Sequence, residues 1–140
     1  MWDKYYSVAT LEEALELLDK EQSTIKIIAG GTDLILEMKQ GLHQGVSSLV
    51  DISRINGLDR VWLEDDSIHI GAAVTHNQCI ASKIVQEYAF PLLQACYGVG
   101  TPQIRNVATI AGNLATASPA NDTIVPLISL DAEVKLQSKV

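Results

Sequence analysis

Two segments of this chain combine glycine with polar side chains in a way that suits an anionic ligand. The first is the pair Gly30 and Gly31, which directly follows a short apolar run at residues 25–29. Glycine has no Cβ and adopts positive φ, so successive backbone N–H groups at such a turn can converge on phosphate oxygens. Thr32 adds a hydroxyl donor. An ordinary turn from a strand into a helix remains the alternative that this loop alone leaves open.

The second segment, residues 109–122, gathers small residues, side-chain donors and one carboxylate within a short stretch. Asn113 offers an amide and Ser118 a hydroxyl to a polar ligand. Asp122 stands where a helix is expected to begin, so it is either the N-cap of that helix or an acceptor for ribose hydroxyls. This composition suits a loop packed against a polar ligand.

Two familiar phosphate-binding motifs are excluded by what the first loop lacks. No Lys-Ser or Lys-Thr pair follows the glycines, as a P-loop requires, and no third glycine stands at the Rossmann spacing. An inward-pointing Asp33 would repel a diphosphate, so we expect its side chain to cap the helical turn at residues 34–39. For Arg105 two alternatives stay open, a phosphate contact and an ion pair with a surface carboxylate.

Charge and apolar content limit the classes of partner. The 140 residues carry a formal net charge of -7, which argues against nucleic acid and anionic membrane surfaces. An acidic chain must hold an anionic cofactor with backbone N–H groups rather than with a basic patch. The apolar stretches are too short to span a membrane and the N-terminus lacks the apolar segment of a secretory signal, so we expect a cytoplasmic protein.

The cysteines and histidines predict no metal site. Cys79 and Cys96 are too few and too far apart for a zinc or iron–sulfur centre, and we expect two reduced, buried thiols. His43, His69 and His76 are scattered without ligand spacing and are expected to have surface or capping roles. No residue is predicted to be a metal ligand, an acid, a base or a nucleophile.

The elements that position these segments follow from the apolar pattern. Residues 101–120 show no periodic apolar face and are predicted to form a long structured loop with strand fragments. A composition shift at residues 51–57 suggests two small lobes, and the class is α+β or mixed α/β. Strands are predicted at residues 25–29, 48–52, 60–63, 67–71 and 132–136, and helices at residues 10–20, 34–39, from 75 onward, 90–98 and 122–130. Thr10 and Glu13 have the spacing of a capping box at the start of the first helix, and Asp65 and Asp66 are expected to turn a hairpin between the third and fourth strands.

The run Ala29-Gly30-Gly31-Thr32-Asp33-Leu34, together with the run from Gln103 to Asn113 and on to Asp122, resembles the FAD-binding subunit of molybdenum hydroxylases. This is the xanthine dehydrogenase and carbon monoxide dehydrogenase flavoprotein family, and the similarity extends over nearly the whole chain. The resemblance implies an α+β fold like that of p-cresol methylhydroxylase and vanillyl-alcohol oxidase, with FAD between two lobes. Residues 1–55 would form the first lobe, and residues 56–140 a second, incomplete one.

The resemblance also implies which residues hold the FAD. Ala111 stands where the family often has a second glycine, which is harmless if φ at this position is negative. The first diphosphate loop would comprise Lys26, Ile27, Ile28, Ala29, Gly30, Gly31, Thr32, Asp33 and Leu34. The second would comprise Thr109, Ile110, Ala111, Gly112 and Asn113, with Ser118 as a further polar contact, Asp122 at the ribitol or ribose and Val99 near the flavin.

The resemblance implies an electron-transfer role. Such a subunit takes electrons from a two-iron two-sulfur small subunit, which draws them from a molybdopterin-binding large subunit, and passes them through FAD to an acceptor such as NAD or oxygen. Both other subunits are therefore expected partners. Two alternatives stay open: a stand-alone nicotinamide-dependent flavoprotein reductase of the same fold, and a non-catalytic remnant or interaction module.

Overall fold

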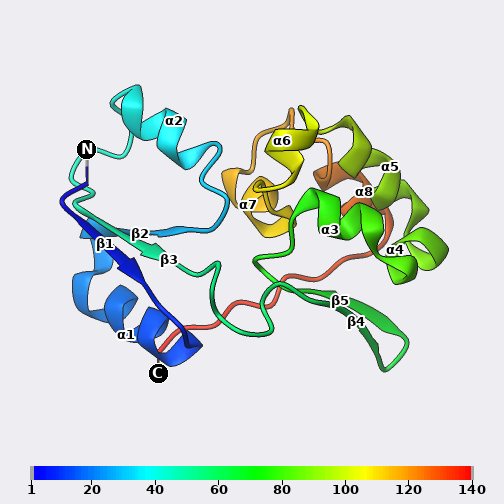
Figure 1. Cartoon of the computed structure of the whole chain (residues 1–140), viewed down its shortest axis with the longest axis horizontal. Helices are drawn as coiled ribbons and strands as arrows, with labels where there is room; N and C mark the ends of the chain where they lie inside the picture. Colours follow the sequence, from blue (N-terminus) through cyan, green and yellow to red (C-terminus); the bar gives the residue numbers. More distant parts are fainter. Residues whose placement is uncertain (1, 140) are drawn as a thin grey trace.

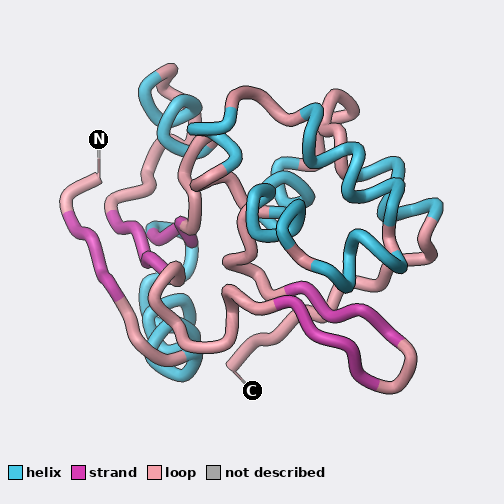
Figure 2. Tube along the Cα trace, turned by 45° about the vertical axis from the view of Figure 1, so that its right-hand side comes forward, coloured by secondary structure: helices cyan, strands magenta, loops and turns pink. Residues whose placement is uncertain are grey.

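A computed structural model describes residues 2–139 and shows two groups of elements side by side (Figure 1). The first, which we call the sheet group, contains strands β1 to β3 with the helices between them. The second, the helical group, contains the hairpin of β4 and β5 and all later helices. Figure 2 shows the same division from a second direction, with the three strands of the sheet apart from the hairpin.

The sheet group is a small parallel sheet with the strand order β1-β3-β2. Its strands are β1 (Lys4–Ser7), β2 (Ile25–Ile28) and β3 (Ser48–Asp51), of which β3 is central and buried throughout. Between β1 and β2 lie α1 (Leu11–Glu21) and the short 3-10 helix η1 (Gln22–Thr24), and α2 (Leu34–Lys39) lies between β2 and β3. The core of this group contains Val8, Ala14, Ile25, Val50, Ile52 and Ile55.

The helical group begins with the antiparallel hairpin of β4 (Val61–Glu64) and β5 (Ser67–Ile70). Its helices are α3 (His76–Ala81), α4 (Lys83–Tyr88), α5 (Phe90–Gly98), α6 (Pro102–Arg105), α7 (Ile110–Thr116) and α8 (Ile124–Ser129). Their core contains Val74, Cys79, Val85, Ala89, Leu92, Leu93, Cys96 and Ile110. Among the described residues, none of the helices has the length and apolar character that crossing a bilayer requires.

Several expectations from the sequence are confirmed. Thr10 and Glu13 form the capping box of α1, with the Thr10 hydroxyl accepting from the Glu13 N–H at 3.2 Å. Asp65 and Asp66 turn the hairpin at φ of 48° and 59°, the positive values that a tight hairpin turn requires. The mixed composition of helices and strands is also as predicted.

The prediction of a long loop at residues 101–120 is wrong, because this stretch contains α6 and α7. Each helix begins at a threonine whose hydroxyl accepts from the backbone N–H three residues later, Thr101 from Ile104 at 3.4 Å and Thr109 from Gly112 at 3.0 Å. The two helices have 4 and 7 residues, too few to show an apolar period in the sequence. The threonine N-caps are the local signal in the sequence that marks the start of these two helices.

The strand predicted at residues 132–136 is also absent. These residues have the apolar alternation of a strand, but no neighbouring strand accepts them, and Leu136 is 87% exposed. The segment runs back across the molecule towards α1 (Figure 1), where Lys139 Nζ lies 3.9 Å from Glu16 Oε1. The alternation of apolar and polar residues is therefore present here, but a strand also needs a neighbouring strand for its backbone hydrogen bonds, and the alternation does not supply one.

The two groups meet through a close approach of backbone at Gly30. A Cβ built on Gly30 would lie 2.0 Å from the carbonyl oxygen of Val107 and 2.9 Å from the Cα of Ala108. Next to this contact, a backbone hydrogen bond joins the start of α3 to Ala108, with the His76 N–H donating to the Ala108 carbonyl at 3.0 Å. Gly30 is thus the position at which the strand-end loop lies directly against the backbone that immediately precedes the second segment.

Replacing Gly30 with alanine is expected to destabilise the protein by about 1–3 kcal/mol or more, because the new methyl group meets backbone that no rotamer change can move. The free energy of unfolding in urea measures this. Gly98→Ala is the matched control, since its Cβ would meet only an Asp122 carboxylate oxygen at 3.9 Å. Equal stabilities of the two variants would contradict the proposed contact.

Candidate functional site

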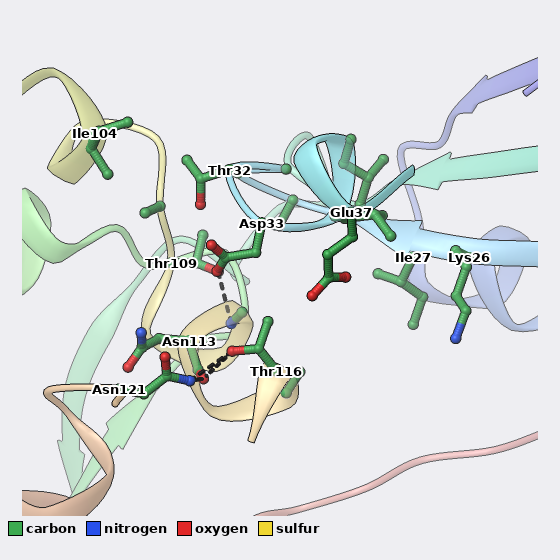
Figure 3. Close-up of a pocket in the computed structure, with 18 of the residues that line it drawn as sticks. Lys26, Ile27, Thr32, Asp33, Glu37, Ile104, Thr109, Asn113, Thr116 and Asn121 are labelled. Atoms are coloured by element: carbon green, nitrogen blue, oxygen red, sulfur yellow. Dashed lines mark hydrogen bonds between the residues drawn. The ribbon is translucent and has the colours of Figure 1, made fainter. Parts of the chain in front are cut away.

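A cavity of about 500 Å³ lies between the first glycine loop and the second segment. Figure 3 shows its lining residues, with α2 on one side and α7 on the other. Among the residues predicted to form a site, the following line it: Lys26, Ile27, Ile28, Ala29, Gly30, Gly31, Thr32, Asp33, Leu34, Val99, Thr109, Gly112 and Asn113. The structure therefore brings the two predicted loops, distant in sequence, to the same cavity.

The first loop presents unpartnered backbone donors. Within residues 2–139, none of the backbone N–H groups of residues 29–33 donates a hydrogen bond to another part of the chain. The turn depends on Gly31, which has a φ of +68°, a region that side chains with a branched Cβ essentially never adopt. A run of free N–H groups beside a cavity is an arrangement that binds anionic oxygens.

The two glycines of this loop serve different purposes. We expected both to allow close approach of a ligand, but Gly30 is required by the Val107 carbonyl on the opposite segment. Gly31 is required by its positive φ, and a Cβ there would also lie 2.8 Å from the Ile28 side chain. The paired glycines therefore shape the cavity wall through contacts within the protein.

The side chain of Asp33 does not cap α2, contrary to expectation. Asp33 has helical φ and ψ and makes no capping hydrogen bond, and its exposed carboxylate is free of the backbone. Figure 3 shows the Asp33 and Glu37 carboxylates directed into the space between α2 and α7. Glu37 is paired with His43 at 2.7 Å. The α2 side of the cavity is consequently acidic, and these carboxylates would repel an anionic group placed beside them.

The side-chain oxygen and the backbone carbonyl of Asn113 are engaged by the protein. Its Oδ1 accepts from the hydroxyl of Thr123, which is fully buried, and its backbone carbonyl accepts from Thr116 Oγ1 at 2.8 Å and from Asn121 Nδ2. Asn121 Nδ2 also donates to Thr116 Oγ1 at 2.6 Å. Asn113 thus connects α7 to the start of α8 and fixes the wall of the cavity at this end.

Four of the predicted site residues do not line the cavity. Ile110 is buried in the core of the helical group. Ala111 lies within α7 and has a negative φ, so alanine is accommodated at this position without backbone strain. The Ser118 hydroxyl accepts from the Ala120 N–H at 3.3 Å. Asp122 is exposed and is not the N-cap of α8, which is Thr123, so the capping alternative for Asp122 is wrong.

Other cavity residues had not been predicted. They include Glu37, His43, Ile104, Ala108, Ala115, Thr116, Asn121 and His76. Of these, His76 was assigned a surface or capping role, and this is wrong because its side chain is fully buried. Burial lowers the pKa of His76, with Asp122 raising it and Arg105 lowering it further through their charges. The sequence shows a capping box around His76, formed by Thr75 and Gln78, but no sign of its burial.

Within residues 2–139, Arg105 forms no ion pair with a carboxylate, and it does not line the cavity. Its Nη1 donates to the carbonyl oxygens of Val99 at 3.0 Å, Gly100 at 3.1 Å and Tyr97 at 3.3 Å. The guanidinium therefore holds the turn after α5, which carries Val99 to the cavity. The expectation of two reduced, buried thiols at Cys79 and Cys96 is confirmed.

The chain is similar in sequence to known proteins. Residues 2–140 match the family model described as the FAD binding domain in molybdopterin dehydrogenase. The chain is 38% identical to the FAD-subunit of nicotinate dehydrogenase from Eubacterium barkeri over 136 residues, which is 96% of this chain and 46% of that protein. It is 35% identical to a xanthine dehydrogenase FAD-binding subunit from Escherichia coli, with the same coverage.

A solved structure agrees with the sequence comparison. The carbon monoxide dehydrogenase of Hydrogenophaga pseudoflava, in a form lacking the Mo-pyranopterin moiety, matches with a TM-score of 0.82 at 34% identity. The match covers 88% of this chain and 42% of that one. The chain thus spans about half the length of the relatives that it matches.

Substituting Asn113 tests the network behind the cavity wall. Asn113→Ala removes the acceptor of the buried Thr123 hydroxyl and is expected to lower the free energy of unfolding by about 1–3 kcal/mol. Thr123→Val, made in the Asn113→Ala background, should recover part of this loss because it removes the unpaired hydroxyl. If Thr123→Val destabilised both backgrounds equally in denaturant unfolding, the two side chains would not be coupled.

Proposed function

Because this chain belongs to the family of FAD binding domains in molybdopterin dehydrogenase, we propose that it is the FAD-binding, electron-transferring part of a multisubunit molybdenum hydroxylase. Electrons would pass from iron–sulfur centres through FAD to an acceptor such as NAD or oxygen. The observation that carries the proposal is the set of unpartnered N–H groups at residues 29–33, which all line a cavity inside a matched FAD-binding domain.

The residues present fit an FAD. The cavity of about 500 Å³ lies within the usual range for small-molecule sites. Small lining residues such as Ala29, Ala108 and Gly112 leave room in it for a ligand. The N–H groups of the first loop would hold the diphosphate. Backbone donors are needed for this because the chain is acidic overall, with a net charge of -7. The Asp33 and Glu37 carboxylates are placed to accept hydrogen bonds from cofactor hydroxyls. When bound, FAD supplies the ability to accept and release electrons.

The remaining predicted contacts belong to this proposal. Thr109 and Gly112 would contribute from the second segment, Val99 would lie near the flavin, and Asp122 would reach the ribitol or ribose side. The lobes would be residues 1–55 and 56–140, in an arrangement like that of p-cresol methylhydroxylase and vanillyl-alcohol oxidase. The two separate apolar cores support this division.

The partners follow from the nature of the relatives. Two are called FAD subunits, and their dehydrogenases act on nicotinate and xanthine, while the matched structure is a carbon monoxide dehydrogenase. One kind of FAD domain therefore occurs with chemically unrelated substrates, which indicates that substrate choice resides elsewhere. We assign the choice of substrate to a molybdopterin-binding large subunit. A two-iron two-sulfur small subunit would pass electrons from that subunit to this chain, and we place the assembly in the cytoplasm. A stand-alone reductase is not favoured by these relatives.

Titration of the purified chain with FAD tests the proposal. We expect flavin absorbance to co-elute with the protein, and we expect FAD at 100 times Kd to stabilise it by about 2.7 kcal/mol in thermal unfolding. A chain that neither retains flavin nor gains stability would contradict the proposal.

A glycine substitution locates the binding loop. Gly31→Val places a branched side chain at a φ of +68° and should raise the Kd for FAD at least about tenfold by distorting the loop. Gly57→Val is the matched control, because Gly57 has a φ of +89° with nothing within 4 Å of its Cβ and does not line the cavity. The control should be destabilised but should keep its Kd. Equal Kd values for all three proteins would remove the first loop from the site.

A further inference from the structure

His76 is a fully buried histidine in the wall of the cavity. It is the first residue of α3, and the capping box of Thr75 and Gln78 holds the start of this helix in place. The His76 N–H donates to the Ala108 carbonyl at 3.0 Å, and the Ile110 N–H donates to the Val74 carbonyl at 3.0 Å. These bonds hold the backbone around His76 against residues 108–110, so its ring projects from a fixed position of the backbone.

Neither ring nitrogen of His76 has a hydrogen-bond partner within residues 2–139. This is unusual because buried polar groups in proteins are almost always paired, and leaving one unpaired costs about 1–3 kcal/mol. The nearby charges do not supply the partner. Asp122 and Arg105 act on His76 only through their charges, and Arg105 Nη1 is engaged by the carbonyls of residues 97, 99 and 100.

An apolar side chain would fill the same space without leaving polar atoms unpaired. The unpaired ring nitrogens therefore point to a hydrogen-bond partner outside residues 2–139. Because burial lowers the pKa of His76, the ring is neutral near pH 7 and carries one N–H donor and one acceptor nitrogen. FAD offers hydroxyls, phosphate oxygens and polar ring edges, so it can pair with either nitrogen.

We propose that His76 contacts the bound cofactor directly, with a ring nitrogen exchanging a hydrogen bond with FAD and so positioning it against α3 and α7. This assignment rests on the proposed function. It adds to the two glycine loops a side chain from a third part of the chain.

The substitution His76→Leu tests the assignment through two opposite effects. The apo protein should be as stable as the unsubstituted chain or more so, because the unpaired nitrogens are gone, whereas the Kd for FAD should rise about tenfold. His76→Gln, which keeps an N–H donor and an acceptor oxygen, should recover most of the affinity. FAD fluorescence quenching measures Kd, and urea unfolding of the apo proteins measures stability.

His69→Leu is the matched control. His69 stacks on Trp62 in the hairpin, with ring centroids 4.9 Å apart, and does not line the cavity, so this variant should keep the Kd of the unsubstituted chain. A second measurement follows the His76 ring nitrogens by ¹⁵N NMR, where at least one resonance should shift when FAD saturates the protein.

The outcomes separate the two proposals. A Kd unchanged in His76→Leu, or ring resonances unmoved at saturation, would overturn the role of His76 while leaving FAD binding intact. Destabilisation of apo His76→Leu with an unchanged Kd would show that the ring is structural. Absence of FAD binding by the unsubstituted chain would overturn the proposed function itself, and the role of His76 with it.

Discussion

The absence of a side chain at Gly30 lets the loop after β2 lie against the backbone of Val107, and the cavity depends on this contact. Each group of elements has its own apolar core, so neither core by itself determines the spacing between the two loops. A contact between backbone atoms determines it, because backbone is far less able to adjust than a flexible side chain. The free N–H groups of residues 29–33 are consequently held at a set distance from α7.

The same constraint places polar groups where the chain cannot pair them. The N–H groups of residues 29–33 and both ring nitrogens of His76 lack partners within the described part of the chain. Those of His76 are buried, and burying a polar group without a hydrogen bond lowers stability. The buried Thr123 hydroxyl, in contrast, donates to Asn113 Oδ1. His76 and residues 29–33 all line one cavity, as expected of a site that gives up folding stability for the binding of a polar ligand.

Local patterns in the sequence predicted most of the elements and both loops. The apolar period and the capping box of Thr10 and Glu13 predicted α1, and the strand followed by paired glycines predicted the first loop. What the sequence could not show depends on contacts between distant residues. Gly30 is explained by Val107, His76 is buried by elements that fold around it, and the alternating residues 132–136 find no strand to pair with. The side chain of Asp33 had two possible orientations, and no local rule selects between them.

The central claim is that the backbone N–H groups of residues 29–33 hold the cofactor. Amide hydrogen exchange resolved by residue with NMR, with and without FAD, tests it most directly. We expect exchange at residues 29–33 to slow markedly on saturation with FAD, because these groups then donate hydrogen bonds, while the amides of the β4–β5 hairpin are unaffected. Bound flavin, seen by its absorbance, together with unchanged exchange at residues 29–33 would contradict the account.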